Sequence, residues 1–394
     1  MTMREAAIIS AVRTGLARAV TGTLRNTRPE YTATEVVKEA IKRTNGLQPQ
    51  DVDDLIMGCA FPEAEMGMNL GRIIALKAGL SSQVPGMTVN RYCASGLEAI
   101  AIACQKIMCG FADVVVAAGV EHMTLVPMGG NKPLPDPELM EDLPEAYMTM
   151  GLTAENVAQR FNISREDQDR FALESHRKAV RAIGEGRFKE QILLLKVVDR
   201  TFEGGKAVNR ERVFDRDECV RPDTSLEALS KLRPIFRAGG SVTAGNSCPM
   251  NDGAAATVVM SRERAKELGL KPMAVFRSIG VGGVDPEIMG IGPVVAVPKA
   301  LKSAGISLDN VDLVELNEAF ASQSLYVVRT LGIDSGRLNV NGGSIALGHP
   351  LGCTGVYLTT KLLYEMERRK VRFGLVTMCI GGGMGAAAIF ERDN

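Results

Sequence analysis

Short apolar runs alternate with segments of helical periodicity along the first 120 residues. Runs rich in Val, Ile and Ala lie at 6–12, 53–60 and 113–119. Such runs are typical of strands. Segments whose apolar residues recur three and four positions apart, which predicts helices, lie between them at 33–43, 69–78 and 97–108. This alternation favours βαβ units and a mostly parallel sheet in an α/β fold.

The last third of the chain repeats this plan. Four of its segments match earlier ones in order and character: VDLVELNEAF matches DDLIMGCA, LNVNGG matches TVNRYC, FGLVTMCIGGG matches ADVVVAAGVEH, and GAAAIFER matches GAAATVVMSRER. The segments LNVNGG and TVNRYC are both predicted to run from a strand into a turn that starts a helix. These echoes indicate two copies of one α/β unit.

The stretch between the two copies, residues 121–245, has a different character. It contains the proline-rich and acidic segment KPLPDPELMEDLPE and then two predicted helices. We expect Thr153 to be the N-cap of the first helix and Ser164 the N-cap of the second, since small hydroxyl side chains favour that position. We interpret the stretch as an insertion in the first copy, and such insertions commonly carry ligand contacts.

Composition and charge exclude several classes of protein. The 46 basic and 46 acidic residues balance, which argues against a nucleic-acid binder, because that class usually shows a basic excess. Eight scattered cysteines with no C-x-x-C spacing and only three histidines argue against a disulfide framework and a structural metal site. The first ten residues have too short an apolar run for a signal peptide, and no run reaches the ~20 residues of a membrane span. We therefore expect a cytoplasmic protein without a transmembrane segment.

Cys93 stands out from the other cysteines by its position. It lies in TVNRYCASGLEAI, between a predicted strand and the first turn of a predicted helix. The unpaired N–H groups of a helix start favour a thiolate, so the position predicts a lowered thiol pKa and a nucleophile. A core cysteine that happens to precede a helix is an equally good interpretation of this segment alone.

Three other segments carry residue types that suit the same chemistry. His349 lies in the glycine-dense segment NGGSIALGHPLGCTG, which predicts a loop, and a loop histidine can serve as a base or simply be unpartnered. Cys379 precedes three glycines that begin at Gly381, whose backbone N–H groups could face an oxyanion or merely form a turn. Asn317 lies where a strand gives way to a helix and could cap that helix, hold a water at the site, or do both.

Taken together, these segments resemble the thiolase family. The resemblance is carried by NRYCASGLEA, ELNEAFASQ, NVNGGSIALGHPLGCTG and TMCIGGGMGAAAIFE, with support from TAENVAQRF, LRPIF, VTAGNS and NDGAAA. It implies the thiolase fold, in which two similar βαβαβαββ halves form a five-layered α-β-α-β-α core. It also implies a division into an N-terminal half at 1–269, with the inserted loop domain at about 121–245, and a C-terminal half at 270–394.

The resemblance also implies catalytic roles. Cys93 would attack a 3-ketoacyl-CoA while His349 takes its proton, and Cys379 would protonate the departing acetyl-CoA enolate. Asn317, through a water, would serve one oxyanion site together with His349, and the N–H groups of Cys93 and Gly381 would serve the other. The resemblance implies no permanently bound cofactor, with coenzyme A as the co-substrate.

By the same resemblance, coenzyme A would lie against the inserted segment. Arg221 would flank the adenine. The residues expected to line the pantetheine are Met150, Ala244, Ser247, Ala319 and Phe320. Two positions depart from short-chain biosynthetic thiolases, which carry histidine where Thr149 stands and serine where Cys248 stands.

The stretch VEHMTLVPM resembles the fatty-acid degradative thiolases, and four methionines could line an acyl channel or pack in the core: Met123, Met128, Met148 and Met150. We therefore expect a 3-ketoacyl-CoA thiolase of β-oxidation. An acetoacetyl-CoA thiolase and a non-catalytic CoA- or lipid-binding relative are the alternatives. A condensing ketosynthase is disfavoured because Cys379 stands where that class has a second histidine. The resemblance further implies a homodimer or homotetramer, with possible association with other β-oxidation enzymes.

Overall fold

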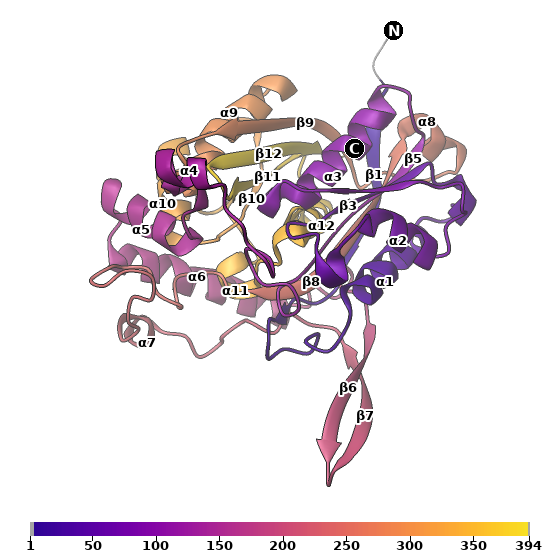
Figure 1. Cartoon of the computed structure of the whole chain (residues 1–394). Helices are drawn as coiled ribbons and strands as arrows, with labels where there is room; N and C mark the ends of the chain where they lie inside the picture. The colour runs from indigo at the N-terminus through magenta and orange to yellow at the C-terminus, as the bar shows by residue number, and fades with distance from the viewer. Residues whose placement is uncertain (1–3, 393–394) are drawn as a thin grey trace.

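The computed structural model describes residues 4–392 and contains one large mixed sheet with two similar parts (Figure 1). The strands of the first part are β1 (Ala6–Arg13), β3 (Asp54–Gly58), β4 (Gly86–Val89), β5 (Val114–His122) and β8 (Asn251–Ser261), and the short β2 (Ala17–Arg18) pairs with β8. Their order is β4-β3-β5-β8-β1. Strand β3 runs parallel to β4 and β5, whereas β8 runs antiparallel to β5 and β1. The mostly parallel sheet expected from the sequence is therefore wrong, because β8 lies between β5 and β1 and runs in the opposite direction to both.

The second part repeats this order. Its strands are β9 (Ala274–Gly283), β10 (Leu313–Leu316), β11 (Phe373–Ile380) and β12 (Met384–Glu391), in the order β10-β11-β12-β9. Strand β10 is parallel to β11, and β12 is antiparallel to β11 and β9. The two parts meet where β1 pairs with β9 over two residue pairs. The matching order and directions confirm the two copies predicted from the sequence echoes.

The strand predicted at LNVNGG is wrong, because only Leu338 pairs there, in an isolated parallel bridge with Val314. Asn339 leaves the extended conformation with φ +42°. Its side-chain amide instead bonds both the N–H and the carbonyl of Leu316, at 2.9 Å each. The bridge nevertheless occupies the position that β4 holds in the first part.

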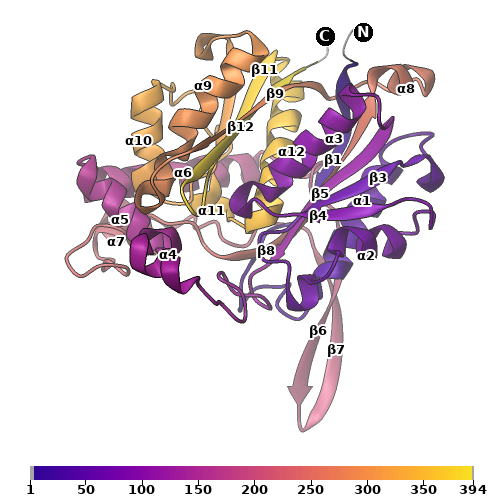
Figure 2. The ribbon, with the colours of Figure 1, turned by 45° about the horizontal axis from the view of Figure 1, so that its top comes forward.

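Helices cover the sheet in layers (Figure 2). The first part is covered on its outer face by α1 (Pro29–Lys42) and α2 (Leu70–Lys77), with α8 (Arg262–Glu267) at its end, and the second part by α9 (Gly292–Ala304) and α10 (Ala321–Leu331). Between the two parts lie α3 (Ser95–Met108) and α12 (Leu351–Arg369), whose apolar side chains share one buried cluster with strands of both parts. The result is five layers, α-β-α-β-α.

The two central helices approach each other closely near their N-termini. A Cβ atom on Gly96 in the first turn of α3 would lie 2.6 Å from the carbonyl oxygen of Gly352 in the first turn of α12. Only glycine permits this backbone approach. It brings the segment before α3, which carries Cys93, next to the segment before α12, which carries His349.

The segment between β5 and β8 carries four α-helices and two strands: α4 (Pro137–Asp142), α5 (Met150–Arg160), α6 (Arg165–Gly184), β6 (Leu195–Glu203), β7 (Lys206–Phe214) and α7 (Leu226–Ser230). Strands β6 and β7 form a hairpin that projects from the body (Figure 1). Ser164 caps α6 as predicted, since its hydroxyl accepts from the N–H of Asp167. The Thr153 prediction is wrong, because α5 begins at Met150 and the Thr153 hydroxyl donates to the Met150 carbonyl within the helix. Among residues 4–392, no helix is both long and apolar enough to cross a membrane.

Candidate active site

Cys93 sits in a tight turn between β4 and α3. The 3₁₀ turn Tyr92–Ala94 leads directly into the helix, and Tyr92 has φ +44°, a left-handed conformation that is costly for a bulky residue. Hydrogen bonds hold the turn: Tyr92 N–H donates to Asn90 at 2.8 Å, and the Ser95 hydroxyl donates to the Tyr92 carbonyl at 2.7 Å. A strained backbone fixed in this way places the Cys93 side chain in one position.

The Cys93 thiol is not activated by its helix. Burial raises its pKa, and the nearby Cys379 raises it further, whereas the backbone N–H of Gly381 lowers it by bonding the sulfur. The lowered pKa expected from the helix start is therefore wrong, because the cost of burying a thiolate exceeds the stabilisation that the N–H groups supply. Cys93 consequently needs a base to take its proton.

His349 is held as a neutral base. Burial lowers its pKa to about 3. The Thr354 hydroxyl donates to the Pro350 carbonyl at 3.1 Å, so it accepts the proton of His349 Nδ1, 2.7 Å away. The lone pair is therefore on Nε2, which faces the Asn317 amide nitrogen at 3.3 Å. The two ring nitrogens thus have Asn317 and Thr354 as partners, and proton transfer between Cys93 and His349 stays a prediction.

The loop that carries His349 is built from both copies of the fold. The single turn α11 (Ser344–Leu347) lies inside the segment that was predicted to be a loop, but His349 itself is non-helical. Gly348 has φ +129°, and the side chain of Asn251 from β8 packs against it. Asn251 accepts from the His349 N–H at 3.1 Å and donates to the Ala17 carbonyl at 2.9 Å. The histidine of the second copy is thereby anchored to the first copy.

Cys379 is the last residue but one of β11, just before the glycine run. Burial raises its pKa to about 11, and a hydrogen bond from Gln323 lowers it. Its apolar neighbours include Ala319, Phe320 and the partly buried Met150. Gly381 lies beyond it with its N–H on the Cys93 sulfur. The structure therefore brings together Cys93, Cys379 and Gly381, as the sequence analysis expected, and it places His349 and Asn317 against each other.

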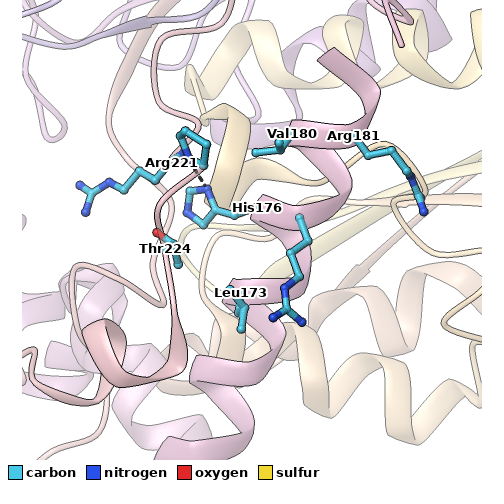
Figure 3. Close-up of a pocket in the computed structure, with 8 residues that line it drawn as sticks. Leu173, His176, Val180, Arg181, Arg221 and Thr224 are labelled. Carbon is cyan, nitrogen blue, oxygen red and sulfur yellow. Dashed lines mark hydrogen bonds between the residues drawn. The ribbon is translucent and has the colours of Figure 1, made fainter. Parts of the chain in front are cut away.

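The residues expected to contact coenzyme A fall into two adjoining groups. Arg221, Ala244 and Ser247 line a small cavity, and Arg221 also lines a larger one of about 210 Å³ beside α6. In the larger cavity the N–H of Arg221 bonds His176 Nδ1 at 3.2 Å (Figure 3). Met150, Ala319 and Phe320 instead pack around Cys379, and Ser247 pairs with Phe320 in an isolated bridge. The two groups thus connect the cavity with the Cys379 thiol.

Comparison with known proteins agrees with this geometry. Family models described as the thiolase N-terminal and C-terminal domains match residues 6–263 and 270–392. The 3-ketoacyl-CoA thiolase of Bacillus subtilis (strain 168) is 54% identical over 390 residues, which cover 99% of this chain and 100% of that relative. The chain belongs to the thiolase family. The thiolase fold expected from the sequence is confirmed.

Two solved thiolase structures are similar along the full chain. The crystal structure of the Bacillus anthracis acetyl-CoA acetyltransferase has a TM-score of 0.90 at 40% identity, and human mitochondrial 3-ketoacyl-CoA thiolase has 0.89 at 36% identity. Each alignment covers 100% of both chains. These names belong to different subclasses, so structural similarity by itself does not separate them.

Sequence reasoning missed several residues of this thiolase site. Asn251 and Gln323 are distant in sequence from the groups they bond. Thr354 lies in the same motif as His349, but threonine is not a reactive residue type and its contact with the histidine was not expected. Of the four methionines, Met123 packs against Cys93 and Met150 against the Cys379 cluster. Thr149 is exposed at the start of α5. No cluster of metal-ligating side chains occurs within residues 4–392.

Proposed function

We propose that this thiolase cleaves a 3-ketoacyl-CoA with coenzyme A, giving acetyl-CoA and an acyl-CoA shortened by two carbons. One observation carries the proposal: two buried thiols, Cys93 and Cys379, lie together with the Gly381 N–H, and the segment that carries the neutral His349 packs against the segment that carries Cys93. The name of the Bacillus subtilis relative supports the same reaction. Retention of this whole set argues against a non-catalytic lipid- or CoA-binding role.

The first half-reaction transfers the acyl group to the enzyme. His349 Nε2 takes the Cys93 proton, and the sulfur attacks the 3-keto carbon. The bond between carbons 2 and 3 then breaks, and its electron pair goes to the acetyl-CoA enolate. Cys379 gives its proton to carbon 2, so acetyl-CoA leaves and the shortened acyl group remains on Cys93 as a thioester.

The second half-reaction restores the enzyme. The Cys379 thiolate takes the thiol proton of the incoming coenzyme A, whose sulfur attacks the thioester carbon. Cys93 leaves as a thiolate and recovers its proton from His349. Developing negative charge on oxygen is stabilised by His349 with Asn317 at one site, and by the N–H groups of Cys93 and Gly381 at the other.

Coenzyme A is a co-substrate in this scheme rather than a resident cofactor. We place its adenine at the cavity beside Arg221 and its pantetheine along Ala244, Ser247 and Phe320. We also propose the division into halves 1–269 and 270–394, with the insertion at about 121–245. The interval between the matched family models supports that boundary.

Chain-length preference is the experiment that tests the subclass. We expect a higher kcat/KM for thiolysis of a long-chain 3-ketoacyl-CoA than for acetoacetyl-CoA, since Met123 and Met150 can adapt to varied acyl chains beside the two thiols. A clear preference for the four-carbon substrate would instead assign an acetyl-CoA acetyltransferase, the name of the Bacillus anthracis structure.

We further propose a cytoplasmic location, a homodimer or homotetramer, and association with other β-oxidation enzymes. All eight cysteines are free, which suits a reducing compartment. Light scattering of the purified chain tests the oligomeric state, and a monomer would contradict it.

A further inference from the structure

Gln323 donates a hydrogen bond to the second thiol. It lies in the first turn of α10, is only 2% exposed, and its Nε2 is 2.8 Å from Cys379 Sγ. The role proposed above requires Cys379 to become a thiolate once in each catalytic cycle. A thiolate buried among apolar side chains is costly unless a donor faces it.

The oxygen end of the Gln323 amide shows how few other interactions this side chain makes. Its Oε1 is buried and has no hydrogen-bond partner among residues 4–392. An unsatisfied buried polar atom costs stability, so the hydrogen bond from Nε2 is the interaction that offsets this cost. In the described structure, Cys379 is the hydrogen-bond partner recorded for this side chain.

Gly290 holds the amide against the sulfur. It belongs to the 3₁₀ turn Pro286–Ile291, and a Cβ atom there would lie 2.4 Å from Gln323 Oε1 and 2.5 Å from Gln323 Cβ. Any larger residue would therefore displace the glutamine. Gly290 is not among the described glycines with a left-handed φ. The close approach of the Gln323 side chain, and not an unusual backbone conformation, is therefore the reason that this position requires glycine.

We propose that Gln323, held in place by Gly290, is a positioning residue that stabilises the Cys379 thiolate and so sets the rate of both proton transfers. This inference rests on the proposed role of Cys379. The hydrogen bond from Gln323 lowers the Cys379 pKa against the effect of burial. The titratable groups facing Cys379 are Cys93 and Cys248, and its other neighbours in the cluster are apolar.

The pH profile of thiolysis in Gln323→Met tests the proposal. Methionine keeps the length of the side chain but cannot donate. We expect kcat at neutral pH to fall about 10- to 100-fold, the range for a hydrogen bond to a charged group, with the KM for coenzyme A within about 2-fold. The rate should recover in part as pH rises, because the thiol of coenzyme A then ionises in solution and no longer has to give its proton to Cys379. Gly290→Ala, which changes neither partner, should give the same profile.

A matched control separates this effect from lost stability. Gln168 on α6 is also fully buried with an unpartnered Oε1, but its amide nitrogen donates to the Ile163 carbonyl and the Ser241 hydroxyl. Gln168→Met should lower the melting temperature without moving the pH profile. If Gln323→Met folds poorly, Gln323→Glu preserves the shape and should lose rate as pH rises, since its carboxylate then repels the thiolate.

Two outcomes would overturn the proposal: an unchanged kcat in Gln323→Met, or a loss by the same factor at every pH. Failure of the proposed function is detected separately. A Cys379→Ser enzyme with the wild-type rate would show that Cys379 moves no proton at all, whatever Gln323 does.

Discussion

The reactive groups of this site rest in neutral forms, and burial is the cause. It raises the pKa of both thiols and lowers that of His349 to about 3. Charge therefore develops only as the reaction proceeds, and each charge needs a donor or acceptor already in place. Each N–H group or amide around the thiols therefore stabilises developing charge more strongly here than it would at an exposed site.

Asn317 is one such amide. Its Nδ2 faces His349 Nε2 at 3.3 Å, and its Oδ1 accepts from the Ser344 hydroxyl at 2.6 Å. Asn317→Ala should lower kcat about 10²- to 10³-fold, the typical cost of losing one oxyanion donor. Ser344→Ala leaves the amide present but less firmly oriented and should cost less. Steady-state thiolysis rates measure the effect of both substitutions. An Asn317→Ala enzyme with the wild-type rate would contradict a role for Asn317 in the reaction.

At the scale of elements, one buried ion pair fixes the inserted segment to the core. Arg13 on β1 makes a bidentate pair with Asp217, which follows β7, at 2.7 and 2.9 Å, and both side chains are fully buried. Asp217 also accepts from the Leu16 N–H at 2.9 Å. The pair holds the chain just before Arg221, where coenzyme A is proposed to bind.

Asp217→Ala should therefore be strongly destabilising. It leaves the Arg13 guanidinium buried without its counter-ion, which typically costs about 3–5 kcal/mol. The exposed pair of Glu227 and Lys231 on α7 is the control, and Glu227→Ala should cost less than about 1 kcal/mol. Urea unfolding followed by circular dichroism measures both. Equal losses in the two variants would contradict this account of the ion pair.

At the scale of the whole molecule, Glu121 joins the two halves. This fully buried carboxylate at the end of β5 accepts from the N–H groups of Ala60 at 2.8 Å, Phe61 at 3.2 Å and Gly352 at 2.7 Å. Gly352 belongs to the second half and follows His349 by three residues. Burial raises the pKa of Glu121 to about 7, although the three N–H groups lower it.

This raised pKa predicts a pH-dependent stability. The folded chain keeps the Glu121 proton up to about pH 7, whereas the unfolded chain releases it near 4.5. The contribution of protonated Glu121 to the free energy of unfolding is thus complete below pH 4.5 and is lost as pH rises to about 7. The loss is on the order of 3 kcal/mol. Glu121→Gln should remove this dependence, so the wild type should lose stability relative to the variant between pH 5 and pH 8.

The measurement compares the urea unfolding midpoints of the wild type and Glu121→Gln between pH 5 and pH 8. Titration of His349 and His176 acts in the opposite direction but is shared by both proteins and cancels in the difference. A difference that stays constant with pH, or that grows in favour of the wild type at high pH, would contradict the prediction.

Much of this architecture follows from local sequence pattern, and its failures have physical causes. The two copies of one α/β unit were predictable because apolar runs and helical periodicity recur in each, whereas the antiparallel pairing of β8 was not. The strand at LNVNGG was not, because the Asn339 side chain replaces the backbone ladder. The Cys93 pKa was predicted in the wrong direction because burial depends on distant residues. Gln323 pairs with Cys379 across 56 positions, a contact that no local pattern contains.

The central claim is that Cys93 carries the acyl group. Rapid quenching after mixing with a 3-ketoacyl-CoA in the absence of free coenzyme A, followed by mass spectrometry of the peptides, tests it most directly. We predict a shortened acyl group on the Cys93 peptide of the wild type, and neither acylation nor turnover in Cys93→Ala. An acyl group that still accumulates on the Cys93→Ala protein would contradict the account.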